Sequence, residues 1–326
     1  MSWIEAIILG IVQGATEFLP ISSTAHLRVV PELFGWPDPQ AAFSAVIQCG
    51  TLVAVIIYFR HDLRQIATAW FRDLLAGTPL RSAAAREGWM ILLGTLPIVV
   101  VGLLLKKHIE SSFRSLYVVA GALIGFGAVM LAAEAFAWWR RSRTPPREMD
   151  QLHAGDAAAM GLAQALALVP GVSRSGATIS AGLVAGLSRE AAARFSFLLS
   201  LPAIFAAAVF ELIKARKELL GTADDAGKLL LATIVAGLVG YAAIAWLLAY
   251  VRQHTTAVFV FYRWLVAGLL LWWLAAGQPA LINTSPVEPH GSASAPDPAA
   301  AHPPVAHSPV RRSAVNGPTV TCSSAG

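Results

Sequence analysis

Most of this chain consists of long runs of apolar residues. Short segments rich in Arg and Lys separate these runs. The runs are about 20 residues long, the length that an α-helix needs to cross a hydrocarbon core of about 30 Å. They predict membrane-spanning helices at 41–59, 88–105, 116–138, 195–213, 229–250 and 256–275. We therefore expect an all-α integral membrane protein with six transmembrane helices.

Two other apolar stretches, 3–28 and 157–187, are interrupted by proline and carry polar side chains. The first contains the run Gln13 to His26, and the second contains the run Pro170 to Thr178. An ionisable group at bilayer depth costs roughly 2.5 kcal/mol or more, so it usually faces a cavity within the protein. Non-helical backbone at that depth is tolerated under the same condition. We predict that each stretch forms a re-entrant helix pair and that the two pairs meet.

The two halves of the chain resemble each other weakly. Gln13 precedes Pro20 by seven positions, Gln164 precedes Pro170 by six, and closely spaced serines follow each proline. Three crossings per half would give the halves opposite orientations, which is the inverted-repeat plan in which broken helices meet near the membrane midplane. The expected units are a first repeat at 1–112, a second repeat at 113–277 and a disordered tail at 278–326.

Composition supports the membrane assignment. Hydrophobic residues make up 56% of the 326 residues and charged residues only 13%, whereas soluble domains have about 25% charged residues. The net charge of +5 comes from Lys and Arg in short loops, which membrane topology explains better than nucleic-acid binding does. The loop after the first span, 60–87, holds five arginines and is expected to be cytoplasmic. Cys49 and Cys322 indicate neither a disulfide framework nor a metal site.

The chemistry of the two polar stretches indicates a phosphorylated ligand. Gln13 and Glu17 are four residues apart and share one face of a helix. Arg174 follows a proline-glycine break, where a new helix would present free N–H groups and its positive dipole end to an anion. Its guanidinium is planar and permanently charged, which suits phosphate. The residues expected to bind the ligand are Gln13, Ser22, Ser173, Ser175 and Thr178.

Several roles for the remaining groups stay open. Glu17 is a candidate either to hold a divalent cation, Mg²⁺ or Ca²⁺, or to accept a proton. His26 is a candidate general acid or base or the nucleophile, and Ser23 is the rival nucleophile. A single carboxylate is not a complete metal site, so water and phosphate would supply most ligands. We expect Glu5, Glu134 and Glu211, near the ends of spans, simply to reach water.

At these two stretches the sequence resembles the undecaprenyl-diphosphatase family of bacterial membrane enzymes. The resemblance implies removal of the terminal phosphate of undecaprenyl diphosphate, which recycles the lipid carrier for cell-wall synthesis. It also implies six crossings with two re-entrant helix pairs in inverted repeats, a divalent cation, and a site open to the outer face of the bacterial plasma membrane. Many members have Glu where this chain has Gln13. The resemblance gives catalytic roles to Glu17, Ser23, His26 and Arg174.

Two other functions remain as alternatives. A transporter or flippase of a phosphorylated lipid would use the same architecture of inverted repeats and broken helices. A purely structural membrane subunit would need none of the polar groups. The expected partners are a polyprenyl diphosphate substrate and membrane lipids, with no nucleic acid, and a homodimer is left open.

Overall fold

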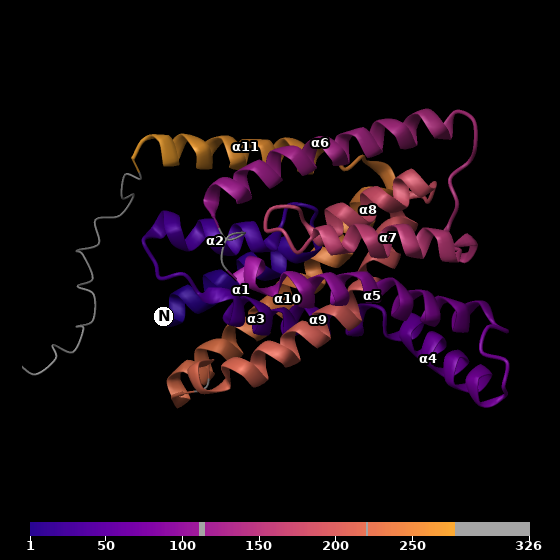
Figure 1. The fold of residues 1–326 in the computed structure, drawn as a ribbon, viewed down its shortest axis with the longest axis horizontal. Helices are drawn as coiled ribbons and strands as arrows, with labels where there is room; N and C mark the ends of the chain where they lie inside the picture. Colours follow the sequence, from indigo (N-terminus) through magenta and orange to yellow (C-terminus); the bar gives the residue numbers. More distant parts are fainter. Residues whose placement is uncertain (111–114, 220, 278–326) are drawn as a thin grey trace, which may run out of the picture. The chain divides into compact units, whose positions relative to one another are not determined.

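A computed structural model describes residues 1–110, 115–219 and 221–277, and the predicted tail at 278–326 lies outside them. The described residues form eleven α-helices and one short 3₁₀ helix (Figure 1). Their bounds are α1 Trp3–Phe18, α2 Ser23–Phe34, α3 Gln40–Tyr58, α4 Arg60–Leu75, α5 Ala83–Glu110, α6 Leu116–Arg141, η2 Met149–Gln151, α7 Ala154–Leu166, α8 Arg174–Ala185, α9 Arg189–Leu219, α10 Ala223–Gln253 and α11 Ala257–Ala275.

Long apolar helices dominate the structure. Helices α5, α6, α9, α10 and α11 are each long and apolar enough to cross a membrane. Helices α3 and α4 pass the same test as a pair, with a bend of 79° between them. Each predicted span falls on one of these helices, and no β-strand occurs within the described residues. The prediction of an all-α membrane protein is therefore confirmed.

The segment after the first span is helical, so its prediction as a loop was wrong. Helix α4 occupies Arg60–Leu75, and α5 begins at Ala83. Ile66 and Ala69 form a buried stripe on α4, which packs against α5. Asp73 accepts hydrogen bonds from the backbone N–H and the hydroxyl of Ser82, at 2.8 and 2.5 Å. Tertiary packing and this turn therefore stabilise a helix at Arg60–Leu75, although the arginines of this segment suggested a loop.

The breaks in the two polar stretches lie at the prolines, as predicted. Helix α1 ends at Phe18, and α2 begins at Ser23, after Pro20. Helix α7 ends at Leu166, and α8 begins at Arg174, after Pro170. Proline cannot donate a backbone hydrogen bond and clashes with the preceding turn of a helix, so it ends α1 and separates α7 from α8.

The packing around the two broken stretches is similar. Helix α1 lies against α10, and α7 lies against α5. Glycines permit both approaches: a Cβ on Gly14 would lie 2.6 Å from Ala236 O, and one on Gly161 would lie 2.3 Å from Gly94 O. Two structurally similar repeats would produce this pattern. The repeat boundary at 112 and 113 lies outside the described residues and stays a prediction.

Aromatic packing fixes the end of α1, where the polar stretch begins. Phe18 is buried, and its ring meets that of Phe197 of α9 edge-on, with 5.2 Å between centroids. Phe59, at the end of α3, packs against the same Phe197 ring. These contacts fix the backbone beside Glu17, the residue that precedes Phe18.

Candidate active site

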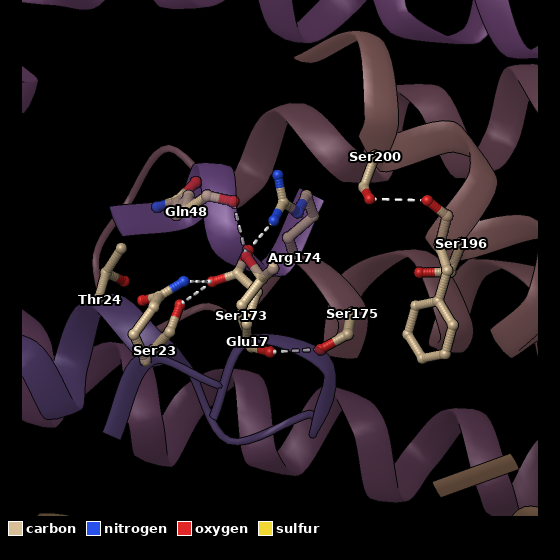
Figure 2. Close-up of polar contacts among 12 residues, drawn as sticks. Glu17, Ser23, Thr24, Gln48, Ser173, Arg174, Ser175, Ser196 and Ser200 are labelled. Carbon is tan, nitrogen blue, oxygen red and sulfur yellow. Dashed lines mark hydrogen bonds and ion pairs between the residues drawn. The ribbon is translucent and has the colours of Figure 1, made fainter. Parts of the chain in front are cut away.

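Three side chains converge on the carboxylate of Glu17, which is itself buried (Figure 2). Gln13 Nε2 donates to Glu17 Oε2 at 2.7 Å, and Ser23 Oγ donates to the same oxygen at 2.6 Å. Arg174 pairs through Nη2 with the other oxygen, Oε1. The acid of the first polar stretch and the guanidinium of the second are thus in contact, as the sequence analysis expected.

The residues that precede α2 and α8 have the same unusual backbone. Ser22 has φ 75° and Ser173 has φ 76°, and these are the described non-glycine residues with positive φ. Such conformations cost about 1–3 kcal/mol and persist where the surroundings enforce them. Each serine caps its helix by accepting from a backbone N–H, that of Ala25 at 3.4 Å or that of Gly176 at 3.2 Å. The site therefore has a strained turn on each side.

Hydrogen bonds between the two turns hold them together. Ser22 Oγ accepts from the backbone N–H of Gly171 at 3.2 Å. In the opposite direction, Ser175 Oγ donates to the backbone oxygen of Leu19 at 3.1 Å. The expected ligand-binding residues Ser22 and Ser175 thus also have a structural role, since they tie one broken stretch to the other, whereas Ser173 caps α8 within the second stretch.

Sequence reasoning missed Arg263, although it lies in the predicted span 256–275. Its side chain is fully buried, and the guanidinium donates to backbone oxygens of both turns and of α6. The five acceptors are Pro20 O at 3.3 Å, Gly171 O at 2.7 Å, Val172 O at 3.1 Å, Ala122 O at 3.2 Å and Leu123 O at 3.3 Å. An arginine within an apolar span was a sufficient signal, because charges at that depth are rare and functional.

His26 is held away from the Glu17 cluster. Its Nδ1 donates to the backbone oxygen of Ser22 at 2.8 Å, because a carbonyl oxygen can only accept. Its Nε2 forms a hydrogen bond with the Tyr262 hydroxyl, also at 2.8 Å, and the two rings stack. His26 is not among the described residues that line the cavity beside Glu17.

Thr178 is also used within the protein. Its Oγ1 donates to the backbone oxygen of Arg174 at 2.8 Å and lies 2.5 Å from Ser196 Oγ of α9. The side chain is fully buried. This arrangement fixes the first turn of α8 and therefore the base of the Arg174 side chain.

A cavity of about 440 Å³ adjoins the cluster. The polar residues of its lining include Glu17, Ser23, Thr24, Gln48, Ser173 and Arg174, all of which are labelled in Figure 2. Its walls are apolar and come from α5 and α9, through Ile98, Gly102, Leu103, Ala203, Ala207 and Phe210. Gln48 of α3 and Glu211 of α9 were not predicted as site residues. The cavity can thus take a ligand with a polar head and an apolar tail.

One feature of this site, a buried amide oxygen without a hydrogen-bond partner among the described residues, suits the expected divalent cation. Gln13 is fully buried, and its Oε1 has no hydrogen-bond partner although its Nε2 is bonded to Glu17. Amide and carboxylate oxygens are the ligands that Mg²⁺ and Ca²⁺ take. No group of three or more His, Cys, Asp or Glu side chains suited to a metal occurs in the described part of the chain. Gln13 and Glu17 would therefore hold a cation only together with water or ligand oxygens.

Comparison with known proteins identifies the family. The family model of bacitracin resistance protein BacA matches residues 6–269, which include both polar stretches and the Arg263 span. The chain belongs to this family. Members named undecaprenyl-diphosphatase from Chloroherpeton thalassium and Prosthecochloris aestuarii are 52% and 51% identical to it, over 279 and 282 residues. Each alignment covers 85% of this chain and 99% of the relative. The resemblance noted in the sequence is thus confirmed.

Proposed function

We propose that this protein hydrolyses undecaprenyl diphosphate to undecaprenyl phosphate and inorganic phosphate, and so recycles the lipid carrier for cell-wall synthesis. The observation that carries the proposal is the Glu17 carboxylate, bonded on one oxygen to Ser23 and on the other to Arg174, at the polar end of an apolar-walled cavity. Relatives more than 50% identical over nearly their whole length bear the name of this activity.

The cavity suits both parts of the substrate. Helices α2 and α8 begin at Ser23 and Arg174, so their free N–H groups and positive dipole ends are directed toward the diphosphate. Arg174 can bind two phosphate oxygens in a planar fork once it leaves Glu17. The apolar walls from α5 and α9 would contact the first isoprene units of the lipid.

Ser23 is the nucleophile in this proposal. Its Oγ attacks the terminal phosphorus, the bond from that phosphorus to the bridging oxygen breaks, and undecaprenyl phosphate leaves. Glu17 accepts the hydroxyl proton through the 2.6 Å hydrogen bond that already joins the two groups. Glu17 passes this proton to the bridging oxygen of the departing undecaprenyl phosphate and is a carboxylate again. It then takes a proton from the water that attacks the phosphoserine, the bond from phosphorus to Ser23 Oγ breaks, and Glu17 returns the proton to that oxygen, which restores Ser23 and releases inorganic phosphate.

Arg174 and the cation share the charge of the headgroup. Arg174 would stabilise the negative charge that the phosphoryl oxygens carry during transfer. A divalent cation held by Glu17 and Gln13 would neutralise part of the diphosphate charge and polarise its oxygens. Arg174 also forms an ion pair with Glu17, so we infer that it exchanges this partner for phosphate oxygens when the diphosphate binds.

We infer that the cavity opens toward the outer face of the bacterial plasma membrane. The cationic end of α6 lies at the far end of α8, where Arg140 donates to the backbone oxygen of Val184 at 3.0 Å. Arg174 begins α8 at the opposite end. Because clustered Arg marks the cytoplasmic side, the headgroup site faces away from the cytoplasm.

Phosphate release tests the proposal. The purified full-length protein should release inorganic phosphate from undecaprenyl diphosphate with Mg²⁺ or Ca²⁺ present, and a chelator should stop it. Glu17→Gln keeps the size of the side chain but removes its charge and basicity, and it should lose at least about 100-fold in rate. Equal release by wild-type protein and Glu17→Gln would contradict the proposal.

A further inference from the structure

Glu211 is a second carboxylate in the wall of the cavity that holds Glu17 and Arg174. It lies in α9, and its side chain is half-buried. Within the described part of the chain it has no hydrogen bond or ion pair. The sequence led us to expect that Glu211 simply reaches water at the end of a span, but its side chain also lines the cavity.

Glu211 is the last residue of α9 that lines the cavity. Ser196 of α9 lies beside Thr178, one turn into α8, and α9 continues from there past Ile204 to Glu211. Ile204 and Glu211 are two helical turns apart, or about 10 Å along the axis. The Glu211 carboxylate therefore lies farther along α9 than the other α9 residues of the lining, in the same cavity as Glu17 and Arg174.

The charges that line the cavity do not favour a free anion. The charged lining residues in the described part of the chain are Glu17, Arg174 and Glu211. Glu17 and Arg174 neutralise each other in their ion pair, so the carboxylate of Glu211 leaves one net negative charge. A diphosphate headgroup is itself a multiply charged anion, and most of the remaining cavity wall is apolar and screens charge poorly.

We propose that Glu211 makes the cavity selective for the cation-bound diphosphate over the free anion; this inference rests on the proposed function. A divalent cation offsets two negative charges of the headgroup, so the complex is repelled far less than the metal-free diphosphate. The same carboxylate disfavours free inorganic phosphate and thereby helps the product to leave. Glu211 is a specificity-determining residue in this scheme and takes no part in bond making.

Binding of a non-hydrolysable prenyl methylenediphosphonate to the purified full-length protein tests the inference. Its dissociation constant is measured by titration calorimetry with excess Mg²⁺ and again with a chelator. The readout is the ratio of the chelator value to the Mg²⁺ value, for wild type, Glu211→Gln and Glu211→Lys. Asp224→Asn is the matched control, since Asp224 is an exposed acid at the start of α10 and does not line the cavity.

Glu211→Gln should lower this ratio about 3- to 10-fold, mainly because the metal-free analogue binds more tightly. Glu211→Lys should lower it further, and Asp224→Asn should leave it within 2-fold of wild type. A ratio unchanged in both Glu211 variants, with unfolding temperatures like that of wild type, would overturn the inference. Failure of wild-type protein to bind the analogue in either condition would instead contradict the proposed function.

Discussion

Ser23 and Arg174 are equivalent residues of α2 and α8, and both bond Glu17. Each is the first residue of its helix and follows a serine cap with positive φ. Ser23 Oγ is 2.6 Å from one oxygen of Glu17, and Arg174 pairs with the other. The two broken stretches thus supply a nucleophile and a phosphate-binding group from matching places, with the base between them.

This relationship predicts a phosphoserine intermediate. Ser23→Ala should reduce phosphate release at least about 100-fold, because the attacking oxygen and its bond to Glu17 are both lost. Ser142→Ala, which removes a hydroxyl bonded only near the end of α6, is the control and should retain wild-type release. Acid quenching of wild-type protein during turnover, followed by peptide mass spectrometry, should find phosphate on Ser23. A phosphohistidine at His26, which would survive only in a parallel sample quenched in alkali, would show that this assignment is wrong.

Arg263 should stabilise the whole site through the two turns. Arg263→Met leaves five buried backbone oxygens without their donor and should lower the free energy of unfolding by about 3 kcal/mol or more. Arg263→Lys keeps the charge but not the planar fork, so it should fall between wild type and Met in both stability and phosphate release.

Arg252→Met is a matched control for Arg263→Met. Arg252 pairs with Glu190 at 2.7 Å and is largely exposed, and such pairs contribute about 1 kcal/mol or less. The measurements are the unfolding temperature in detergent and the rate of phosphate release. Equal unfolding temperatures for the Arg263 and Arg252 variants would argue against a structural role of Arg263 in the site.

Close helix packing gives opposite predictions for two glycines. A Cβ on Gly50 of α3 would lie 1.9 Å from the backbone oxygen of Thr233 in α10, so Gly50→Ala should destabilise the protein by about 1–3 kcal/mol. A Cβ on Gly125 of α6 would meet no other atom within 4 Å. Gly125→Ala should therefore be neutral or stabilise by up to about 1 kcal/mol, through higher helix propensity. The same sign of change in unfolding temperature for both variants would contradict the packing described.

Much of the architecture could be predicted from the sequence because membrane spans and prolines leave strong local signals. The six apolar runs fall on helices, and the breaks at Pro20 and Pro170 separate α1 from α2 and α7 from α8. The contact between Glu17 and Arg174 followed from the cost of isolated charges at membrane depth.

Other features depend on contacts that the sequence does not encode locally. Helix α4 was missed because its arginines suggested a loop, whereas its stability comes from Ile66 and Ala69 packing on α5. The acceptors of Arg263 are backbone oxygens, which have no signature in side-chain identity. Likewise, nothing near His26 in the sequence indicates that Tyr262, on α11, would bond its ring.

The most direct test of the central claim compares two arginines in the same assay. Arg174→Gln removes the guanidinium that meets Glu17, whereas Arg194→Gln removes one that pairs with Asp62 at 3.0 Å outside the headgroup cavity. Phosphate release from undecaprenyl diphosphate should fall at least about 100-fold in Arg174→Gln, because the group that stabilises the phosphoryl charge is lost. Release by Arg194→Gln should stay within about 3-fold of wild type, as expected for a partly exposed ion pair. Wild-type release by Arg174→Gln would contradict the account.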